Sequence, residues 1–184
     1  MNPHDVRIGR RRFLRAASLT CLSVGLMGGP LAFGGVRKPR ELAFFHTHTG
    51  ERLKVTYADE TGYLDDSLAE INRFLRDFRT GEVYPIDTAV LDILDAAREG
   101  LSASGVFEVI SGYRSPKTNE TLRQQGHAVA KRSLHMQGRA IDVRLSGVPT
   151  HRLRKFCRDL KRGGVGYYPR SDFIHVDNGR VRIW

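Results

Sequence analysis

A stretch of ten residues, from Ser133 to Asp142, restricts the folding of this chain more than any other. It contains His135 and, three residues later, Gly138, which has no side chain and permits a tight bend. After the bend, apolar residues at 141, 143 and 145 alternate with Asp142 and Arg144, which is the two-residue period of a β-strand. An aspartate that points inward from a strand is costly to bury unless a cation or hydrogen-bond donors meet it. The stretch therefore predicts a bend that leads into a strand carrying a polar site.

A second stretch, from Asp172 to Asp177, contains residues that complete such a site. Its alternation is again that of a strand, with His175 and Asp177 on one face. If the two strands pair, His135, Asp142 and His175 converge. Two neutral imidazoles and one carboxylate form a three-ligand zinc site, with a fourth position left for water. Asp172 lies three residues before the last histidine, where it could reach that water as a general base.

The order and spacing of these residues resemble those in a known group of enzymes. The pattern Ser133-x-His135-x-x-Gly138-x-Ala140-x-Asp142, followed by Asp172-x-x-His175, is similar to that of the LAS group of zinc metallopeptidases. This group contains D-Ala-D-Ala dipeptidases and carboxypeptidases, murein endopeptidases, phage endolysins and the Hedgehog signalling fold. Three further segments resemble its murein endopeptidase K branch, namely Phe45–Glu51, Ser111–Ser115 and Gly166–Tyr168. The resemblance extends from about Glu41 to Trp184.

The resemblance implies a zinc-dependent hydrolase of the bacterial cell wall. Enzymes of this branch hydrolyse peptide cross-links of peptidoglycan at the L,D bond between two meso-diaminopimelate residues, with some activity on D-Ala-diaminopimelate bonds. By this similarity, Zn²⁺ binds to His135, Asp142 and His175. Asp172 activates water, and Arg114 positions the peptide or stabilises the oxyanion. The implied partner is cross-linked peptidoglycan. The expected fold is α+β, with a small antiparallel sheet that carries the zinc site and packs against helices.

Other polar and aromatic residues near these motifs have two interpretations each. Ser133 either forms a hydrogen bond near the site or shapes the turn, and Asp177 either orients a ligating histidine or pairs with an arginine. Three tyrosines either line the cleft or pack in the core, namely Tyr113, Tyr167 and Tyr168. The remaining histidines lack ligand spacing and are interpreted as non-ligands, namely His46, His48, His127 and His151.

The first 34 residues have the pattern of an export signal. Gly9–Arg15 contains the consecutive arginines, phenylalanine and leucine of a twin-arginine motif, and Ala16–Gly29 is a mildly apolar run. The run is too short to span a membrane as a helix. Small residues at Ala32–Gly34 offer a cleavage site. The sequence therefore predicts a twin-arginine signal peptide over residues 1–34, a metallopeptidase domain over residues 35–184, and a periplasmic protein with no stable membrane span.

The net charge of +10 bears on the class of partner. Residues 1–34 hold five arginines and one aspartate, which account for four of these charges. The remaining basic surface suits a polyanion, but no stripe of stacking or base-reading residues accompanies it, so we expect no nucleic-acid partner.

Cys157 would be the single cysteine of the exported chain, and its apolar helical neighbours predict that it is buried. We expect a monomer.

Hydrophobic periodicity predicts the other elements of an α+β domain. Asp66, Asp87 and Ser115 stand where helix N-caps are expected, and Pro149 opens a further helix that runs to about Lys161. Besides the strand at 139–145, short strands are predicted at Leu42–His46, Arg52–Tyr57, Phe107–Ile110, Val165–Tyr167, Phe173–Asp177 and Val181–Trp184.

Three alternative functions compete with the endopeptidase prediction. A D,D-carboxypeptidase or dipeptidase with the same zinc site would require a free stem-peptide end, so it would cut monomeric pentapeptide stems and leave dimers joined. A non-catalytic, zinc-stabilised peptidoglycan-binding domain is the second alternative, and the presence of Asp172 argues against it. A nucleic-acid-binding protein is the third, and the export signal argues against it.

Overall fold

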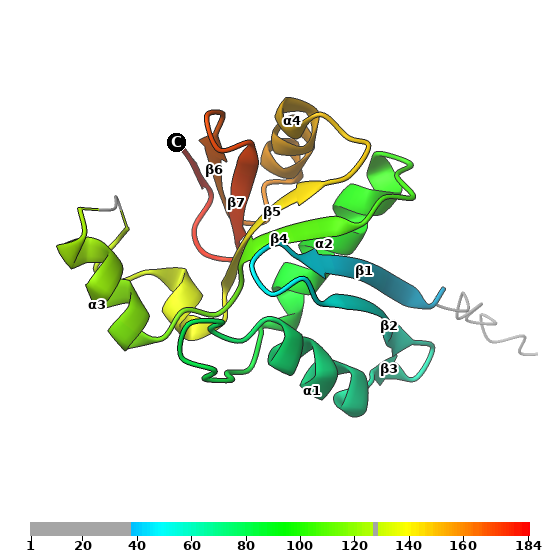
Figure 1. Cartoon of the computed structure of the whole chain (residues 1–184). Coiled ribbons are helices and arrows are strands. Elements are labelled where there is room, and N and C mark those ends of the chain that lie inside the picture. The colour runs from blue at the N-terminus through cyan, green and yellow to red at the C-terminus, as the bar shows by residue number, and fades with distance from the viewer. Residues whose placement is uncertain (1–37, 127–128) are drawn as a thin grey trace, which may run out of the picture. The chain divides into compact units, whose positions relative to one another are not determined.

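The computed structural model describes residues 38–126 and 129–184 (Figure 1). The predicted signal peptide and His127 therefore lie outside the described residues. Within them, one sheet has the strand order β3-β2-β1-β4-β5-β7-β6-β8. The strands are β1 (Arg40–His46), β2 (Arg52–Asp59), β3 (Gly62–Tyr63), β4 (Phe107–Ser111), β5 (Ala140–Leu145), β6 (Gly164–Tyr168), β7 (Phe173–Asp177) and β8 (Arg182–Ile183).

The prediction of an α+β fold is confirmed, and the sheet is larger than expected. Strands β4, β5, β7 and β6 pair antiparallel, as predicted for the part that carries the site. The N-terminal hairpin β1–β2 joins the same sheet through parallel pairing of β1 with β4, with Phe44 opposite Phe107. Both side chains are buried and their rings lie 6.3 Å apart. Burial of these apolar side chains stabilises the wide mixed sheet in preference to a separate hairpin.

Four α-helices and one 3₁₀ helix complete the described part of the domain. They are α1 (Asp65–Phe74), α2 (Thr88–Gly100), α3 (Pro116–Gln124), the 3₁₀ helix η1 (Leu134–Gln137) and α4 (Thr150–Leu160). The predicted caps of α2 and α3 are confirmed, since Asp87 accepts from Ala89 N and Ser115 accepts from Thr118 N. The predicted cap at Asp66 is wrong, because the N-cap position is Leu64, two residues earlier, and α1 starts at Asp65 with no side-chain cap.

The two faces of the central sheet have different roles. Val143 and Ile174 pair across β5 and β7 and are fully buried. Helix α4 packs against these two strands, and α2 packs against α4 and against β1. Figure 1 shows α4 beside β5, β6 and β7, and α3 projecting away from the sheet. Cys157 on α4 is buried, as predicted, and burial raises the pKa of its thiol to about 12. The opposite face of β5 and β7 carries polar side chains, among them Asp142 and His175.

Candidate metal centre

A row of paired residues crosses four strands on the polar face of the sheet. Ser111 on β4 lies opposite Asp142 on β5, Asp142 lies opposite His175 on β7, and His175 lies opposite Gly166 on β6. Paired residues of antiparallel strands point to the same side, with Cβ atoms about 4.5–5.5 Å apart. The predicted pairing of the two motif strands is therefore the feature that brings Asp142 and His175 together.

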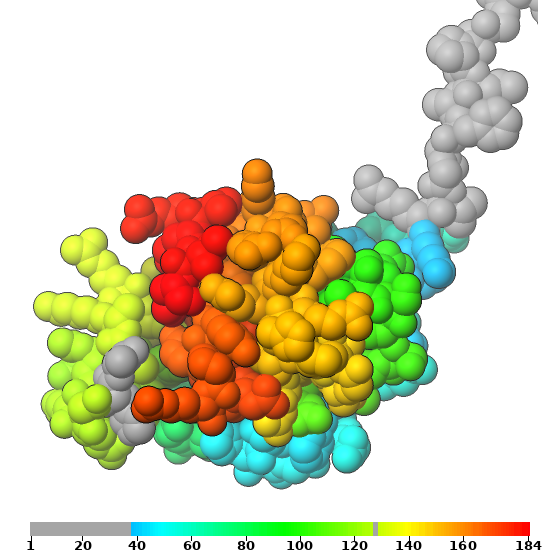
Figure 2. Space-filling view, turned by 90° about the horizontal axis from the view of Figure 1, so that it is seen from above, coloured from blue at the N-terminus to red at the C-terminus, as the bar shows by residue number. Residues whose placement is uncertain are grey.

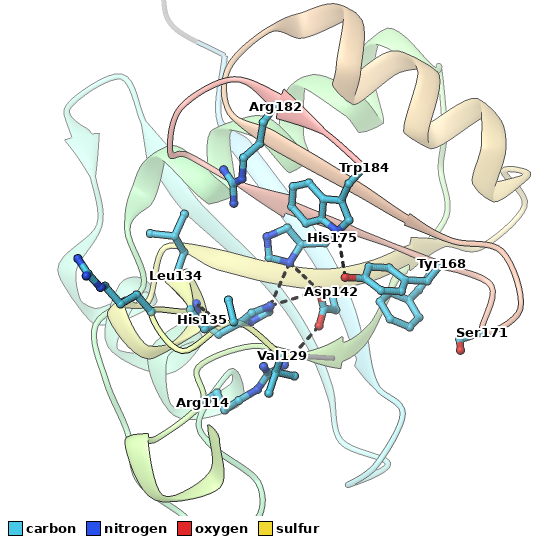
Figure 3. Close-up of a pocket in the computed structure, with 14 residues that line it drawn as sticks. Arg114, Val129, Leu134, His135, Asp142, Tyr168, Ser171, His175, Arg182 and Trp184 are labelled. Atoms are coloured by element: carbon cyan, nitrogen blue, oxygen red, sulfur yellow. Dashed lines mark hydrogen bonds and ion pairs between the residues drawn. The ribbon is translucent and has the colours of Figure 1, made fainter. Parts of the chain in front are cut away.

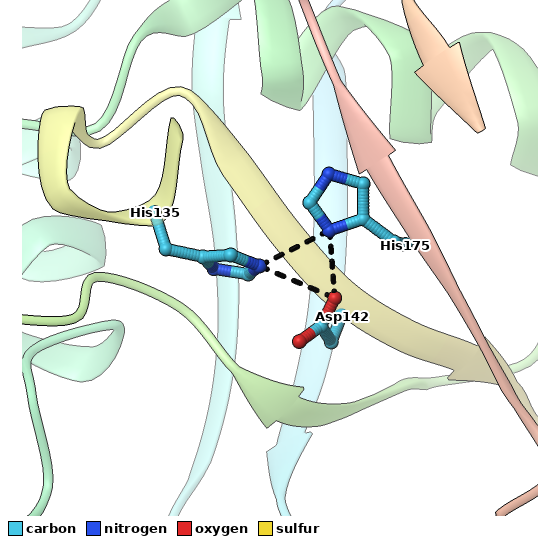
Figure 4. Close-up of side chains that lie close together, drawn as sticks. All are labelled: His135, Asp142 and His175. Carbon is cyan, nitrogen blue, oxygen red and sulfur yellow. Dashed lines mark hydrogen bonds and ion pairs between the residues drawn. The ribbon is translucent and has the colours of Figure 1, made fainter. Parts of the chain in front are cut away.

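Three side-chain atoms of the predicted ligands form a compact triangle (Figure 4). His175 Nδ1 lies 2.9 Å from Asp142 Oδ1 and 3.1 Å from His135 Nε2, and the third side measures 3.2 Å. Ligand atoms that bind zinc tetrahedrally at about 2.0–2.1 Å are separated by roughly 3.3–3.4 Å. The three atoms therefore need to move apart only slightly to hold one such ion.

The second ring nitrogen of each histidine indicates which nitrogen is free to bind a metal. His135 Nδ1 lies 2.7 Å from the carbonyl oxygen of Gly112, and His175 Nε2 lies 2.9 Å from Asp177 Oδ2. Both acceptors require that the facing nitrogen carries the proton. In the neutral imidazoles, the lone pairs of His135 Nε2 and His175 Nδ1 then point at each other and at the carboxylate of Asp142. Three converging lone pairs fit a bound cation.

Burial and neighbouring charges act in opposite directions on the titratable groups of this cluster. Burial alone would raise the pKa of Asp142, but His135 and His175 lower it well below its usual range. Burial likewise opposes protonation of His175, yet hydrogen bonds to Asp142 and Asp177 raise its pKa. The site thus stabilises Asp142 as a carboxylate, which is the form that binds metal.

Asp177 has both of the contacts that the sequence left as alternatives. It is fully buried and accepts from His175, and Arg182 donates to it at 2.6 Å. The backbone N–H groups of Gly164 and Gly179 also donate to it. A carboxylate with this many donors is rigid, so it fixes the ring of His175 from the side opposite Asp142.

The loop before β5 positions His135. Ser133 caps η1 by accepting from the backbone N–H of His135 at 3.4 Å, so it shapes the turn. Gly138 ends η1 with a φ of 64°, in the left-handed region. A Cβ at this position would lie 2.0 Å from the carbonyl oxygen of Pro85. The bend predicted at Gly138 therefore requires glycine for both its backbone conformation and its close packing.

Arg114 lies beside the ligand triangle. Its Nη2 is 3.6 Å from Asp142 Oδ2, the carboxylate oxygen outside the triangle, and 3.4 Å from Ser111 Oγ. Burial lowers the pKa of the guanidinium, and the charge of Asp142 opposes this. Asp77 accepts from the backbone N–H of Ser115 at 2.9 Å and so holds the segment that carries Arg114. These distances place Arg114 next to the three predicted ligands, and its role toward a substrate stays a prediction.

A cavity of about 580 Å³ opens over the triangle (Figure 3). Figure 2 shows α3 in yellow-green and the C-terminal strands in orange and red at one face of the molecule. One wall of the cavity comes from residues 129–134 and the other from the end of β6 to β8. Its lining residues are Arg114, Val129, Ala130, Arg132, Ser133, Leu134, His135, Asp142, Tyr168, Ser171, Phe173, His175, Arg182 and Trp184. This volume is sufficient for a peptide segment.

Asp172 lies at the rim of this region, and its carboxylate is directed elsewhere. The hydroxyl of Thr150 donates to it, and Arg144 Nη1 lies 4.0 Å away. Its side chain is 65% exposed, and its φ is 49°. The flanking residues Ser171 and Phe173 line the cavity, whereas Asp172 does not. Its role as a base stays a prediction.

The other histidines described lie outside the triangle. His46 is fully buried and its Nδ1 accepts from the backbone of His48, and burial lowers the pKa of His46 to about 4. The His48 ring stacks on Phe78 at 4.3 Å, and His151 is exposed on α4.

The three tyrosines named from the sequence have different positions. Tyr113 is buried and donates to Glu82 at 2.7 Å, and Tyr167 packs against the core. Tyr168 lines the cavity. Three other cavity residues were not predicted from the sequence, namely Phe173, Arg182 and Trp184. Phe173 shares a strand face with His175, and this alternation was the signal available for it.

No helix among residues 38–126 and 129–184 is both long enough and apolar enough to cross a membrane.

The family model described as peptidoglycan L,D-endopeptidase MepK matches residues 35–184. The peptidoglycan L,D-endopeptidase MepK of Escherichia coli (strain K12) is 38% identical over 175 residues, which cover 95% of this chain and 96% of that protein. The probable peptidoglycan L,D-endopeptidase MepK of Haemophilus influenzae is 38% identical over 176 residues, or 95% of each chain. No solved structure gives a significant match. The match over most of the chain and the assembled ligand triangle lead to one conclusion: the chain is a peptidase and belongs to the peptidoglycan L,D-endopeptidase MepK family.

Proposed function

We propose that this protein is an exported, zinc-dependent endopeptidase that hydrolyses peptide cross-links of peptidoglycan. The observation that carries the proposal is the convergence of three lone pairs, from His135, Asp142 and His175, at a cavity large enough for a peptide. The names of the relatives from Escherichia coli and Haemophilus influenzae support the substrate class.

Zinc is the metal that we propose for the triangle. Two imidazole nitrogens and one carboxylate oxygen form a typical catalytic zinc set, and no redox chemistry is needed. A bound zinc ion would polarise the scissile carbonyl and lower the pKa of a water molecule. The protein's own contribution is orientation, because Gly112 and Asp177 hold the two imidazoles in the tautomers that leave the inner nitrogens free.

Arg114 is the proposed substrate-positioning group. Its guanidinium lines the cavity next to Asp142, and a guanidinium binds carbonyl or carboxylate oxygens with geometric specificity. Asp172 is the proposed general base because of its place in the motif. This role requires its carboxylate to exchange the hydrogen bond from Thr150 for one to the reacting water.

The L,D bond between two meso-diaminopimelate residues is the proposed main target, with D-Ala-diaminopimelate bonds as a second. The relatives' names specify L,D-endopeptidases. Diaminopimelate peptides carry several carboxylates, and three arginines line the cavity, namely Arg114, Arg132 and Arg182. This charge complementarity supports an anionic peptide substrate.

Export through the twin-arginine route to the periplasm is part of the proposal. Its support is the arginine motif in residues 1–34 and the agreement between the predicted boundary and the family match, which begins at residue 35. Cross-linked peptidoglycan lies outside the cytoplasmic membrane, so an enzyme that cuts it must be exported.

A muropeptide digest tests the proposed function. The zinc-loaded protein is incubated with cross-linked dimers of both linkage types and with pentapeptide monomers, beside the His135→Ala variant. We expect the parent protein to split dimers, with L,D-linked dimers cut faster, and the variant to leave them intact. Removal of the terminal residue from monomers, with dimers left joined, would identify a carboxypeptidase. Zinc binding without any hydrolysis would identify a binding domain.

A further inference from the structure

Three aromatic side chains form one wall of the cavity next to the metal ligands. This aromatic wall consists of Tyr168 on β6, Phe173 on β7 and Trp184 after β8. The ring of Trp184 lies 5.2 Å from the ring of His175, and its Nε1 donates to the hydroxyl of Tyr168 at 3.2 Å. The wall thus connects a metal ligand to a tyrosine hydroxyl through two direct contacts.

The sheet register directs Tyr168 toward the triangle. Tyr168 lies opposite Phe173, and His175 is two residues further along β7 on the same face. Such diagonal neighbours have backbones about 7–8 Å apart, which is within reach of an aromatic side chain. In Figure 3 the hydroxyl of Tyr168 points toward His175 and Asp142.

The hydroxyl of Tyr168 has a proton left to donate. An indole nitrogen is a donor only, so Trp184 uses a lone pair of the Tyr168 oxygen and leaves its O–H free. Among the side-chain hydrogen bonds of residues 38–126 and 129–184, none has the Tyr168 hydroxyl as the donor. The free O–H is available to a substrate in the cavity.

The aromatic wall is built to hold this hydroxyl in place. Tyr168 stacks on Phe173 with ring centres 4.6 Å apart and planes 16° apart. Trp184 rests on Gly166, where an added Cβ would lie 2.6 Å from the indole. The guanidinium of Arg182 lies 4.8 Å from the indole ring and is itself held by Asp177. A donor held by packing on several sides loses little entropy when it binds substrate.

We propose that Tyr168 is a catalytic residue whose hydroxyl donates a hydrogen bond to the carbonyl oxygen of the scissile peptide. This inference rests on the proposed endopeptidase function. The carbonyl oxygen gains negative charge as its carbon becomes tetrahedral, so a fixed donor stabilises the transition state more than the ground state. No proton is transferred, and no covalent bond of the tyrosine changes. Arg114 cannot supply the whole of this stabilisation, because its charge is shared with Asp142 at 3.6 Å.

Steady-state hydrolysis of cross-linked dimers tests the role of the hydroxyl. Tyr168→Phe removes the hydroxyl and keeps the ring that stacks on Phe173. We expect kcat to fall about 10²–10³-fold, as for loss of one oxyanion donor. KM and zinc affinity stay within about two-fold of the parent values. A phosphinate analogue of the tetrahedral carbon should lose affinity by the same factor as kcat/KM, because it mimics the transition state.

Two further variants control for structural effects. Tyr167→Phe removes the hydroxyl of the neighbouring tyrosine, which lies opposite Ile174 and faces the core, and should leave kcat unchanged. Trp184→Phe removes the donor that orients Tyr168 and should lower kcat by less than Tyr168→Phe does.

Three results would overturn the inference, and each has a different meaning. A Tyr168→Phe enzyme with parental kcat and analogue affinity, measured beside an active parent, overturns the role of Tyr168 alone. A zinc-loaded parent that splits no dimer overturns the proposed function and this inference with it. Equal losses of kcat and of zinc affinity in Tyr168→Phe would also overturn the inference, since they would reflect damage to the metal site.

Discussion

Asp142 and His175 lie directly opposite each other on β5 and β7, and Asp142 Oδ1 is 2.9 Å from His175 Nδ1. This pairing makes the register of the sheet a condition for assembly of the proposed metal site. A shift of one residue would turn either side chain toward the opposite face, which α4 covers. His135 is the ligand that comes from outside the sheet, so its position depends on the loop that ends at Gly138.

The first prediction concerns Gly138. Gly138→Ala should destabilise the protein, because the added Cβ would approach the Pro85 carbonyl oxygen to 2.0 Å. Gly147→Ala is the matched control, since Gly147 also has a positive φ, 78°, but no atom near its Cβ position. We expect the free energy of unfolding of Gly138→Ala to be about 1–3 kcal/mol lower than that of the control. Urea unfolding of both variants measures the difference, and equal values would contradict the packing role.

The second prediction concerns Asp177. Asp177→Asn keeps the shape of the side chain and removes the charge that fixes His175 and pairs with Arg182. Zinc affinity should fall about 10–100-fold, as expected when a carboxylate behind a metal-binding histidine is lost. Competition with a chromophoric chelator measures it. Asp159→Asn on α4 removes an exposed aspartate and serves as the control, and a variant with parental zinc affinity would show that Asp177 does not support the ligand.

The third prediction concerns Asp172. Asp172→Asn should lower kcat about 10²–10⁴-fold with bound zinc retained, because general-base catalysis contributes a factor of this size. Thr150→Val removes the hydroxyl that donates to Asp172 and tests the structural contact separately. We expect Thr150→Val to keep most of the activity. Loss of stability without loss of kcat in Asp172→Asn would instead assign the residue to holding Thr150 at the start of α4.

The fourth prediction is a pH dependence from His46. Burial lowers the pKa of His46 to about 4, whereas an unfolded histidine titrates near 6.5. Between these values the unfolded chain binds the proton and the folded protein does not. The free energy of unfolding should therefore decrease by about 2–3 kcal/mol as the pH falls from about 6.5 to about 4.

Urea titrations of the metal-free protein at several pH values measure this dependence. The slope should become flatter in His46→Leu and remain parental in His151→Leu, which removes an exposed histidine. An unchanged slope in His46→Leu would show that other groups cause the acid destabilisation.

The sequence was informative about the site because its signals are local. Alternation around Asp142 and His175 fixed which side chains share a face, and a glycine at 138 marked the bend that brings in His135. The pattern of carboxylate and imidazole donors then limited the chemistry.

Long-range packing was not visible in the sequence. Parallel pairing of β1 with β4 joins residues that are more than 60 positions apart, and no local pattern specifies it. The same holds for Trp184. Its indole packs beside His175 because Gly166, on another strand, has no Cβ to collide with it.

The most direct test of the account is a zinc titration with activity measured on the same samples. The metal-free protein receives increasing zinc, and both bound metal and cleavage of cross-linked dimers are recorded, beside His135→Ala. We predict that activity rises in proportion to bound zinc and reaches its maximum at one ion per chain, while His135→Ala shows neither tight binding nor cleavage. Cleavage by the metal-free protein, or by His135→Ala, would contradict the assignment of His135, Asp142 and His175 as the catalytic metal site.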